Sequence, residues 1–170
     1  MIAEPVLAAP MPLRAAVLAA LDDVADPEIP AVSVVELGMI GAVEARSGSI
    51  RVELLPTFVG CPAIDLIRAA VEDRLATFGV PVSVDVSFET PWTSDRISAS
   101  GREKLRRSGF APPPPVRAGR ALPMVELVPV ACPYCGSHRT TLESVFGPTQ
   151  CRSIRHCADC RQSFESFKPI

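Results

Sequence analysis

Apolar side chains recur at three- and four-residue steps in two segments of the first half of the chain, which predicts two amphipathic helices. The first helix begins after Pro12 and ends near Asp26, because Pro27 disfavours helical geometry at the residue before it. The second helix is followed by Gly79, and glycine is typical of the position just past a helix end. The first stripe comprises Leu13, Ala16, Val17, Ala20, Leu21 and Val24, and the second comprises Ile64, Ile67, Val71, Leu75 and Phe78.

Apolar and polar residues alternate in the segments around these helices, which predicts strands. Residues 50–54 alternate, and Ser47-Gly48, a pair typical of turns, joins them to residues 39–45, so we expect a hairpin. Residues 80–88 alternate strictly and predict a further strand. A last helix over 95–107 has few apolar positions and is expected to lie on the outside. The order helix, hairpin, helix, strand indicates a small α+β domain.

A proline-rich segment over 109–124 divides the chain. Its composition favours extended polyproline conformation and does not build a core. Residues 1–108 hold fifteen acids and ten bases, whereas residues 125–170 hold four acids, five bases and five of the six cysteines. We therefore predict an α+β domain over 13–108, a proline-rich linker over 109–124 and a small cysteine-rich unit over 125–170.

Charge and composition exclude several classes of protein. The 170 residues carry a formal net charge of -2, so no chain-wide basic field is present to hold nucleic acid or an anionic membrane. The longest uncharged stretch, residues 127–138, is shorter than the roughly 18 apolar residues of a spanning helix. Neither a Gly-x-Ser-x-Gly turn nor a Gly-rich phosphate loop occurs. We expect a soluble, cytoplasmic protein that binds neither membrane nor nucleic acid.

Two C-x-x-C pairs in the C-terminal unit are typical of a zinc ribbon. Cys132 and Cys135 form the first pair, Cys157 and Cys160 form the second, and twenty-one residues separate them. Four thiolates on tetrahedral zinc can hold together a unit that has too few apolar residues for a core. Disulfides are the alternative, which a reducing cytoplasm disfavours. Sequence alone does not distinguish zinc from iron at a four-cysteine site.

Cys61 lies between a predicted strand and the second predicted helix. Pro62 is favoured in a first helical turn, so Cys61 is expected at or near the N-cap, where backbone N–H groups stabilise a thiolate. Thr57 and Gly60 belong to the same connection. A reactive or metal-binding thiol is one interpretation, and a small buried residue that closes the turn is the other.

Further polar groups would collect beside Cys61 if the loops of this domain converge. The alternative for the acids of the 26–30 segment is that they only shape a turn. Cys151 is a fifth cysteine of the C-terminal unit, expected in a loop that leads into a strand. It is either an inert buried residue or, with Cys61, a thiolate ligand for iron or an iron–sulfur species in transit. The polar residues that would collect there are Asp26, Glu28, Thr57 and Thr90.

Several motifs resemble those of the metal-sulfur cluster assembly domain family that includes SufT-type proteins. With the linker and the C-terminal ribbon, nearly the whole chain resembles the PaaD (PaaJ) family of the phenylacetyl-CoA ring-epoxidase system, which serves aerobic phenylacetate degradation. The motifs are Asp26-Pro27-Glu28, Val35-Glu36-Leu37-Gly38-Met39-Ile40, Thr57 with Gly60-Cys61-Pro62, Pro91-Trp92-Thr93, and the segment from Cys157 to Lys168.

This resemblance implies an accessory component whose catalytic diiron oxygenase and flavin/Fe–S reductase are separate chains. It implies a role in maturing an iron–sulfur or iron centre, with Cys61 engaging the metal or cluster beside Asp26 and Glu28. We expect structural zinc in the ribbon, a transient iron or iron–sulfur cluster, partners among the oxygenase and reductase subunits, and no catalysis by this chain alone. The alternative is a non-catalytic structural adaptor with a purely structural zinc site and a buried Cys61.

Overall fold

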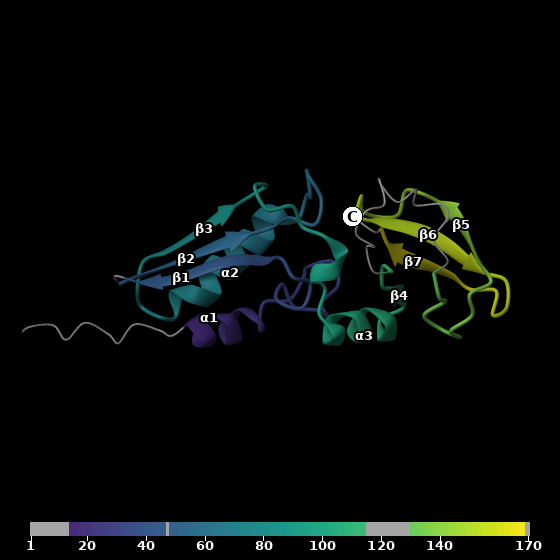
Figure 1. Cartoon of the computed structure of the whole chain (residues 1–170), viewed down its shortest axis with the longest axis horizontal. Helices are drawn as coiled ribbons and strands as arrows, with labels where there is room; N and C mark the ends of the chain where they lie inside the picture. Colours follow the sequence, from purple (N-terminus) through teal and green to yellow (C-terminus); the bar gives the residue numbers. More distant parts are fainter. Residues whose placement is uncertain (1–13, 47, 115–129, 169–170) are drawn as a thin grey trace, which may run out of the picture.

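The computed structural model describes residues 14–46, 48–114 and 130–168. Figure 1 shows an N-terminal α+β unit beside a C-terminal β unit, with α3 near the junction. None of the helices in these three stretches is long and apolar enough to cross a membrane. The elements are α1 (Arg14–Leu21), β1 (Ile40–Arg46), β2 (Ser49–Leu54), α2 (Ile64–Ala76), β3 (Val82–Val86), the 3-10 turn η1 (Ser94–Arg96), α3 (Ala99–Arg107), β4 (Phe110–Ala111), β5 (Thr140–Ser144), β6 (Arg152–Cys157) and β7 (Ser163–Phe167).

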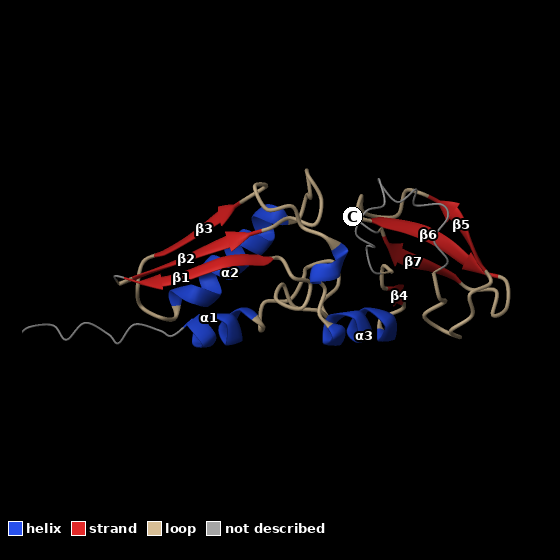
Figure 2. Ribbon diagram, in the orientation of Figure 1, coloured by secondary structure: helices blue, strands red, loops and turns tan. Residues whose placement is uncertain are grey.

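The N-terminal unit is built on a three-stranded sheet of order β1-β2-β3. β1 and β2 form the predicted antiparallel hairpin, and β3 runs parallel to β2 after the α2 connection. Val52 lies opposite Val43 on one side and Val84 on the other, so the buried valines of the three strands share one face. α2 packs against the sheet and α1 packs beside α2 and β1 (Figure 2). This layer encloses the main core.

The first helix is shorter than its apolar pattern predicts. α1 ends at Leu21, five residues before Asp26. Val24 is nevertheless buried, because the chain after the helix is extended and pairs with the segment that follows. The N–H of Val34 donates to the carbonyl of Val24 at 2.9 Å, and the N–H of Asp26 donates to Val32 at 2.9 Å. A valine three residues after Leu21 can be buried in a continued helix or in an extended segment. The spacing of apolar residues alone therefore predicts a helix end that is too late.

A hydrogen-bonded turn between α1 and β1 is fixed by Ser33 and Glu36. The N–H of Glu36 donates to the Ser33 hydroxyl at 3.0 Å, and the N–H of Ser33 donates to the Glu36 carboxylate at 3.1 Å. This reciprocal arrangement is a capping box. Lys104 of α3 adds an ion pair to the same carboxylate at 2.8 Å. α3 is thereby tied to the turn through a buried acid.

The segment after β3 packs closely on the chain just after that turn. The indole N–H of Trp92 donates to the carbonyl of Leu37 at 2.9 Å, and Nε of Arg96 donates to the carbonyl of Gly38 at 2.9 Å. Gly38 has a φ of +69°, and a Cβ there would lie within 2.7 Å of the Arg96 backbone. Only glycine combines this left-handed conformation with so close an approach. The predicted last helix accordingly appears as η1 followed by α3.

The C-terminal unit is a four-stranded sheet of order β4-β7-β6-β5. β5, β6 and β7 are antiparallel neighbours, and β4 pairs with β7 in parallel. β4 falls within the first residues of the predicted linker, and its Ala111 is fully buried. Residues 115–124 of that linker lie outside the described residues, and the domain boundaries stay a prediction. A second, small core holds Ala111, Val130, Cys132, Cys157 and Phe164.

The two units share apolar contacts. Cys151 and Phe167 of the C-terminal unit are buried in the main core cluster, and Phe110 packs against that cluster. The ribbon is therefore packed against the α+β unit at the end where β6 begins (Figure 1). The predicted fold class, an α+β domain followed by a four-cysteine ribbon, is confirmed.

Candidate functional site

Two matching turns carry the four cysteines of the ribbon. The N–H of Gly136 donates to the carbonyl of Cys132 at 2.9 Å, and the N–H of Arg161 donates to the carbonyl of Cys157 at 2.9 Å. Gly136 and Arg161 each follow the second cysteine of a pair, and both have positive φ, +74° and +59°. The two C-x-x-C segments thus form the same tight knuckle, which aims each pair of sulfurs toward the other pair.

The four sulfurs form a compact cluster. Sγ of Cys132 lies 3.6 Å from Sγ of Cys160, and Sγ of Cys135 lies 3.6 Å from Sγ of Cys157. All four sulfurs lie within 4.8 Å of one another. A zinc ion with Zn–S bonds of about 2.3 Å needs sulfurs about 3.8 Å apart, whereas a disulfide needs about 2.0 Å. The donors therefore fit a tetrahedral metal site, and all four cysteines are free thiols.

The charge balance of this cluster favours a bound cation. Backbone N–H groups of Cys160 and Asp159 lower the pKa of Cys157 to about 6. The N–H of Gln162 acts in the same direction on Cys160, but burial and the neighbouring sulfurs raise the pKa of Cys160 to about 12. Once one cysteine is a thiolate, its negative charge makes the neighbouring thiols harder to deprotonate. A bound metal cation offsets this repulsion and allows all four to be thiolates.

Cys61 lies in a turn before α2 rather than at the N-cap of the helix. α2 begins at Ile64 and its N-cap is Ala63. The N–H of Cys61 donates to the carbonyl of Phe58 at 3.1 Å, and the carbonyl of Cys61 accepts from Ile64 at 3.3 Å. Cys61 is therefore near the N-cap, as expected, but two residues before it, because the chain makes one more turn before the helix starts.

The expectation that backbone N–H groups lower the pKa of Cys61 is wrong. Burial raises the pKa of Cys61, and one backbone N–H, that of Ala63, only partly offsets it. The negative charges of Cys151, Glu28 and Asp26 raise this pKa further. Cys61 is half-buried and packs against the main core. Without a metal, the thiol form is favoured at neutral pH, and the negative groups around it attract a cation instead.

The acidic loop over 26–30 lies beside Cys61 and has two different carboxyl groups. Oδ1 of Asp26 accepts the N–H groups of Glu28 and Ile29, both at 2.9 Å. This carboxylate therefore shapes the loop, and burial raises its pKa. Glu28 is turned toward the C-terminal unit, where its Oε2 lies 3.3 Å from a guanidinium nitrogen of Arg152.

Cys151 reaches the same region from the C-terminal unit. It is buried, its sulfur lies 3.2 Å from the Thr149 hydroxyl, and burial raises its pKa. Arg152 follows directly and is buried as well. Its guanidinium binds Glu165 at 2.8 Å and Thr149 at 2.7 Å in addition to Glu28. The structure therefore brings Cys61, Cys151 and the acidic loop together at the junction of the two units.

The remaining predicted residues have different positions. Thr57 is buried between β2 and the Cys61 turn, and Gly60 has a φ of +97° in that turn. Pro62 and Thr90 are exposed. Among the described residues, the ribbon is the one set of three or more ligand groups that lie within 4.8 Å of one another. Cys61, Cys151 and the acidic loop therefore lie in one region but do not form a complete set of metal ligands.

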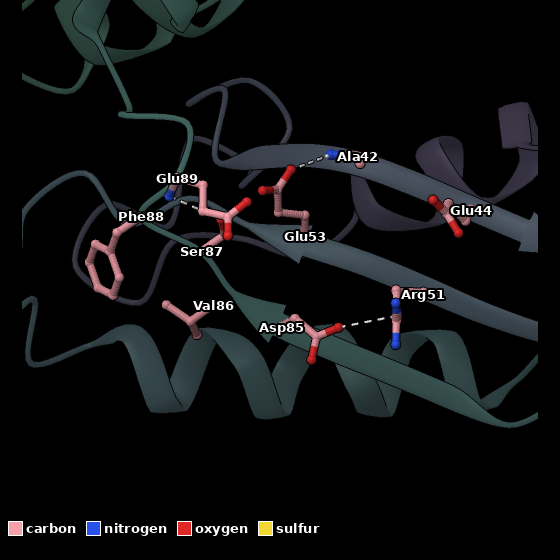
Figure 3. Close-up of a pocket in the computed structure, with 9 residues that line it drawn as sticks. All are labelled: Ala42, Glu44, Arg51, Glu53, Asp85, Val86, Ser87, Phe88 and Glu89. Atoms are coloured by element: carbon pink, nitrogen blue, oxygen red, sulfur yellow. Dashed lines mark hydrogen bonds and ion pairs between the residues drawn. The ribbon is translucent and has the colours of Figure 1, made fainter.

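Sequence reasoning did not single out Arg152 or the Ser33–Glu36 pair. The S-x-x-E spacing was a signal for the second, whereas nothing local indicates that Arg152 crosses between units. A hollow of about 900 Å³ on the sheet face was also missed (Figure 3). It is away from the cysteines, and an Arg51–Asp85 ion pair and a hydrogen bond from Ala42 to Glu53 cross it. Its lining residues are Ala42, Glu44, Arg51, Glu53, Asp85, Val86, Ser87, Phe88 and Glu89.

Comparison with known protein families gives a match for each of the two units. The family model "PaaD zinc beta ribbon domain" matches residues 124–168, and "Iron-sulfur cluster assembly protein" matches residues 14–88. An Escherichia coli (strain K12) relative, named as one subunit of a "Putative 1,2-phenylacetyl-CoA epoxidase", is 36% identical over 153 residues, which cover 89% of this chain and 90% of that protein. The chain belongs to the PaaD family. The predicted resemblance is therefore confirmed for the ribbon, the assembly domain and their combination.

Other relatives match about half of this PaaD family member. The Bacillus subtilis (strain 168) protein "Fe-S protein maturation auxiliary factor YitW" is 30% identical over 89 residues, 51% of this chain and 86% of that protein. The crystal structure of a DUF59 domain from Bacillus anthracis is 29% identical, covers 52% of this chain and 87% of its own, and has a TM-score of 0.49.

Proposed function

We propose that this PaaD family protein is an accessory, non-catalytic component of a phenylacetyl-CoA epoxidase system in the cytoplasm, where it assists maturation of an iron–sulfur or iron centre during phenylacetate degradation. The oxygenase and reductase subunits are its partners. The observation that supports this function most is the set of thiol and carboxyl groups at the junction, which is separate from the ribbon cysteines. The name of the E. coli relative supports the system, and that of the B. subtilis relative supports the maturation role.

Zinc in the ribbon has a structural role in this proposal. The ion is held by four sulfurs, those of Cys132, Cys135, Cys157 and Cys160. Because they complete a tetrahedral shell, no coordination position is left for a substrate or a partner's ligand. When bound, zinc supplies folding energy to a unit whose own core is small. The ribbon thereby keeps β6 in register and holds its first residues against the N-terminal unit.

The groups at the junction suit transient metal binding. Cys61 is half-buried and therefore still accessible, and Glu28 adds an oxygen donor beside it. Thiolates suit iron and iron–sulfur clusters. Because burial, and to a lesser extent the surrounding negative groups, oppose deprotonation, the thiolate forms as the cation binds, and release of the cation restores the thiol. Such coupling is appropriate to transient binding.

A structural adaptor is the second candidate. The observation that favours it is the burial of Cys61 against the main core, which stabilises its neutral thiol. In that case the ribbon and the α+β unit bind the partner subunits, and substitution of Cys61 has little consequence.

The deciding experiment is metal and sulfide analysis of protein purified anaerobically. Zinc, iron and acid-labile sulfide are measured per chain for the wild type and for Cys61→Ser. Zinc together with iron or sulfide that disappears in the variant supports the maturation role at Cys61. Zinc alone, unchanged in the variant, contradicts that role and favours the adaptor. Ser49→Ala, at an exposed position of β2 that is not a candidate for the site, is the control and keeps the wild-type content in either case.

A further inference from the structure

β3 lies at a sheet edge that lacks the protection of the other edges. Among the described residues, β1 and β3 are the edge strands of one sheet, and β4 and β5 are those of the other. A register shift interrupts the pairing of β1 with β2 and that of β5 with β6, and β4 has only two residues. Bulges and very short strands keep a sheet edge from pairing with another chain. β3 pairs with β2 over five residues without a register shift and has neither form of protection (Figure 2).

The outer side of β3 presents the backbone groups of its three valines. The carbonyl of Pro81 accepts from the N–H of Ile50 at 2.9 Å. The N–H of Ser87 donates to the carbonyl of Leu54 at 3.0 Å. Because backbone groups alternate in direction along a strand, the odd-numbered residues of β3 face β2 and the even-numbered ones face outward. No strand of the described part of the chain pairs with that outer side. The outward-facing residues are Val82, Val84 and Val86.

The two faces of the sheet differ beside this edge. On the face that α2 covers, Val82 and Val86 are half-buried and pack against the main core. On the opposite face lies the hollow of about 900 Å³ (Figure 3). Successive side chains of a strand alternate between the two faces. A segment that pairs with β3 therefore places every second side chain beside the valines and the intervening ones beside the hollow.

The hollow has an excess of negative charge. Four acids and one arginine line it, and the arginine, Arg51, is paired with Asp85 at 3.3 Å. The N–H of Ala42 donates to Glu53 at 2.9 Å and holds the pKa of that carboxyl below its usual value, so Glu53 is ionised at neutral pH. This surface attracts cationic side chains.

Three further lining residues are available to a partner. The ion pairs among the described residues include neither Glu44 nor Glu89. Phe88, just past the end of β3, is 57% exposed and offers an aromatic surface to a cation. A second copy of the chain on the same edge brings its own acids beside these, and like charges on neighbouring strands are destabilising. Lysine and arginine are the complementary side chains.

We propose that the outer edge of β3 docks an extended segment of a partner protein in which basic and apolar residues alternate. The backbone of the segment pairs with Val82, Val84 and Val86, its basic side chains lie over the hollow, and its apolar side chains extend the core beside the valines. No cysteine lines the hollow, so this docking surface is independent of the role of Cys61.

Amide hydrogen exchange of the zinc-loaded full chain, followed by NMR, tests whether the edge is open. We expect fast exchange at the three valines and slow exchange at Ser83 and Asp85, whose N–H groups face β2. Slow exchange at all five overturns the open edge. If that slow exchange requires a high concentration of the chain, the occupant is a second copy rather than a basic partner.

The probe for the partner segment is a short synthetic peptide in which lysine and valine alternate. In an NMR titration of the full chain, we expect it to bind, to slow the exchange of the three valines, and to bind less tightly as the salt concentration rises. A glutamate–valine peptide of the same length is the control and is expected not to bind. Equal binding of the two peptides, or no binding of the lysine peptide, overturns the proposal.

N-methylation of the peptide separates backbone pairing from attraction by charge alone. One peptide has N-methyl groups on its lysines and another has them on its valines, and both keep the positive charge. Only one of these two sets of N–H groups can point toward β3. We expect one modified peptide to lose binding and the other to keep it. If both bind as the unmodified peptide does, the edge is not the docking site.

Two pairs of acids provide matched variants of the chain. Glu44→Gln combined with Glu89→Gln removes charge from the hollow and is expected to weaken binding of the lysine peptide about fivefold, as the loss of two exposed ion pairs does. Glu72→Gln combined with Asp73→Asn changes the net charge equally, but on α2, and is expected to weaken binding by less than about twofold. Equal weakening by the two pairs contradicts the hollow as the site, because only the overall charge would then matter.

Discussion

Arg152 of β6 binds Glu28 of the N-terminal acidic loop across the junction of the two units, at 3.3 Å and with only 6% of the arginine side chain exposed. The two residues are 124 positions apart in the sequence, and the chain between them includes every element of the N-terminal unit except α1. This contact fixes the start of β6, and therefore Cys151, relative to the Cys61 turn. The geometry of the junction depends on one guanidinium that both units bind.

Replacement of Arg152 is expected to destabilise the fold. Arg152→Met leaves Glu28 and Glu165 without their cation, and loss of one member of a buried ion pair costs about 3 kcal/mol or more. We expect about 2–3 kcal/mol here, because the two carboxylates are 28% and 26% exposed and water compensates part of the loss. Urea unfolding followed by circular dichroism measures the change.

Arg51→Met is the control for this prediction. Arg51 pairs with Asp85 at 3.3 Å, but both side chains are more than 60% exposed, so its replacement is expected to cost less than about 1 kcal/mol. If the two variants are equally stable, the Arg152 contacts contribute no more than a surface ion pair.

Gly38 and Gly79 provide a test of the packing between the 33–38 turn and η1. Their φ values are nearly equal, +69° and +68°, so alanine suffers the same left-handed strain at both, about 1–2 kcal/mol. A Cβ at Gly38 also meets the Arg96 backbone, whereas one at Gly79 meets nothing within 4 Å. Gly38→Ala is therefore expected to cost about 1–3 kcal/mol more than Gly79→Ala. Urea midpoints of the two variants give the difference, and equal midpoints contradict the close approach.

Local pattern was sufficient for most of the fold and for the ribbon. The hairpin, α2 and β3 lie where periodicity and Gly79 indicate, because each element has a regular apolar face and a glycine or turn at its end. The two C-x-x-C pairs converge because each knuckle is a local structure. α1 was predicted too long, since Val24 is buried equally well in an extended segment.

Several residues of the junction were predicted from the sequence, but their electrostatic environment was not. Cys61, Cys151 and the acidic loop were each noticed, but the pKa shift of Cys61 was predicted in the wrong direction. That direction depends on burial and on charges that come partly from the other unit, far away in the sequence. Arg152 was missed for the same reason, because its partner in the N-terminal unit is set by packing rather than by spacing.

Removal of the ribbon metal is expected to unfold the C-terminal unit and leave the N-terminal unit folded. The chain has one tryptophan and one tyrosine. Trp92 is buried in the N-terminal unit, and Tyr134 lies in the first cysteine knuckle. After chelation or in Cys157→Ser, we expect the near-ultraviolet signal of Tyr134 to collapse while the emission of Trp92 keeps its folded maximum.

The matched control for this prediction is Cys61→Ser, which leaves the four ribbon sulfurs in place and is expected to preserve the Tyr134 signal. A red shift of Trp92 emission on chelation contradicts the expected independence of the N-terminal unit, since it shows that the main core requires the ribbon.

The buried carboxylate of Glu36 makes stability depend on pH. Partial burial raises its pKa, but hydrogen bonds from Lys104 and from the N–H of Ser33 outweigh this and hold the pKa of Glu36 below its usual value. A folded-state pKa below the unfolded one means that the carboxylate stabilises the fold above the unfolded pKa, and this contribution is lost as the pH falls through the folded pKa. At pH 7, Glu36→Gln is expected to cost about 2 kcal/mol, the range for a hydrogen bond to a charged group.

Urea unfolding at several pH values tests this dependence. The difference in unfolding free energy between the wild type and Glu36→Gln should be constant near neutral pH. It should begin to decrease near the unfolded glutamate pKa of about 4.3 and continue to decrease until the folded carboxyl is protonated. Glu44→Gln, at an exposed position of β1, is the control and should change stability by less than about 0.5 kcal/mol throughout. A difference for Glu36→Gln that does not change with pH shows that shape rather than charge holds the turn, because the protonated carboxyl would then stabilise it as well as the carboxylate does.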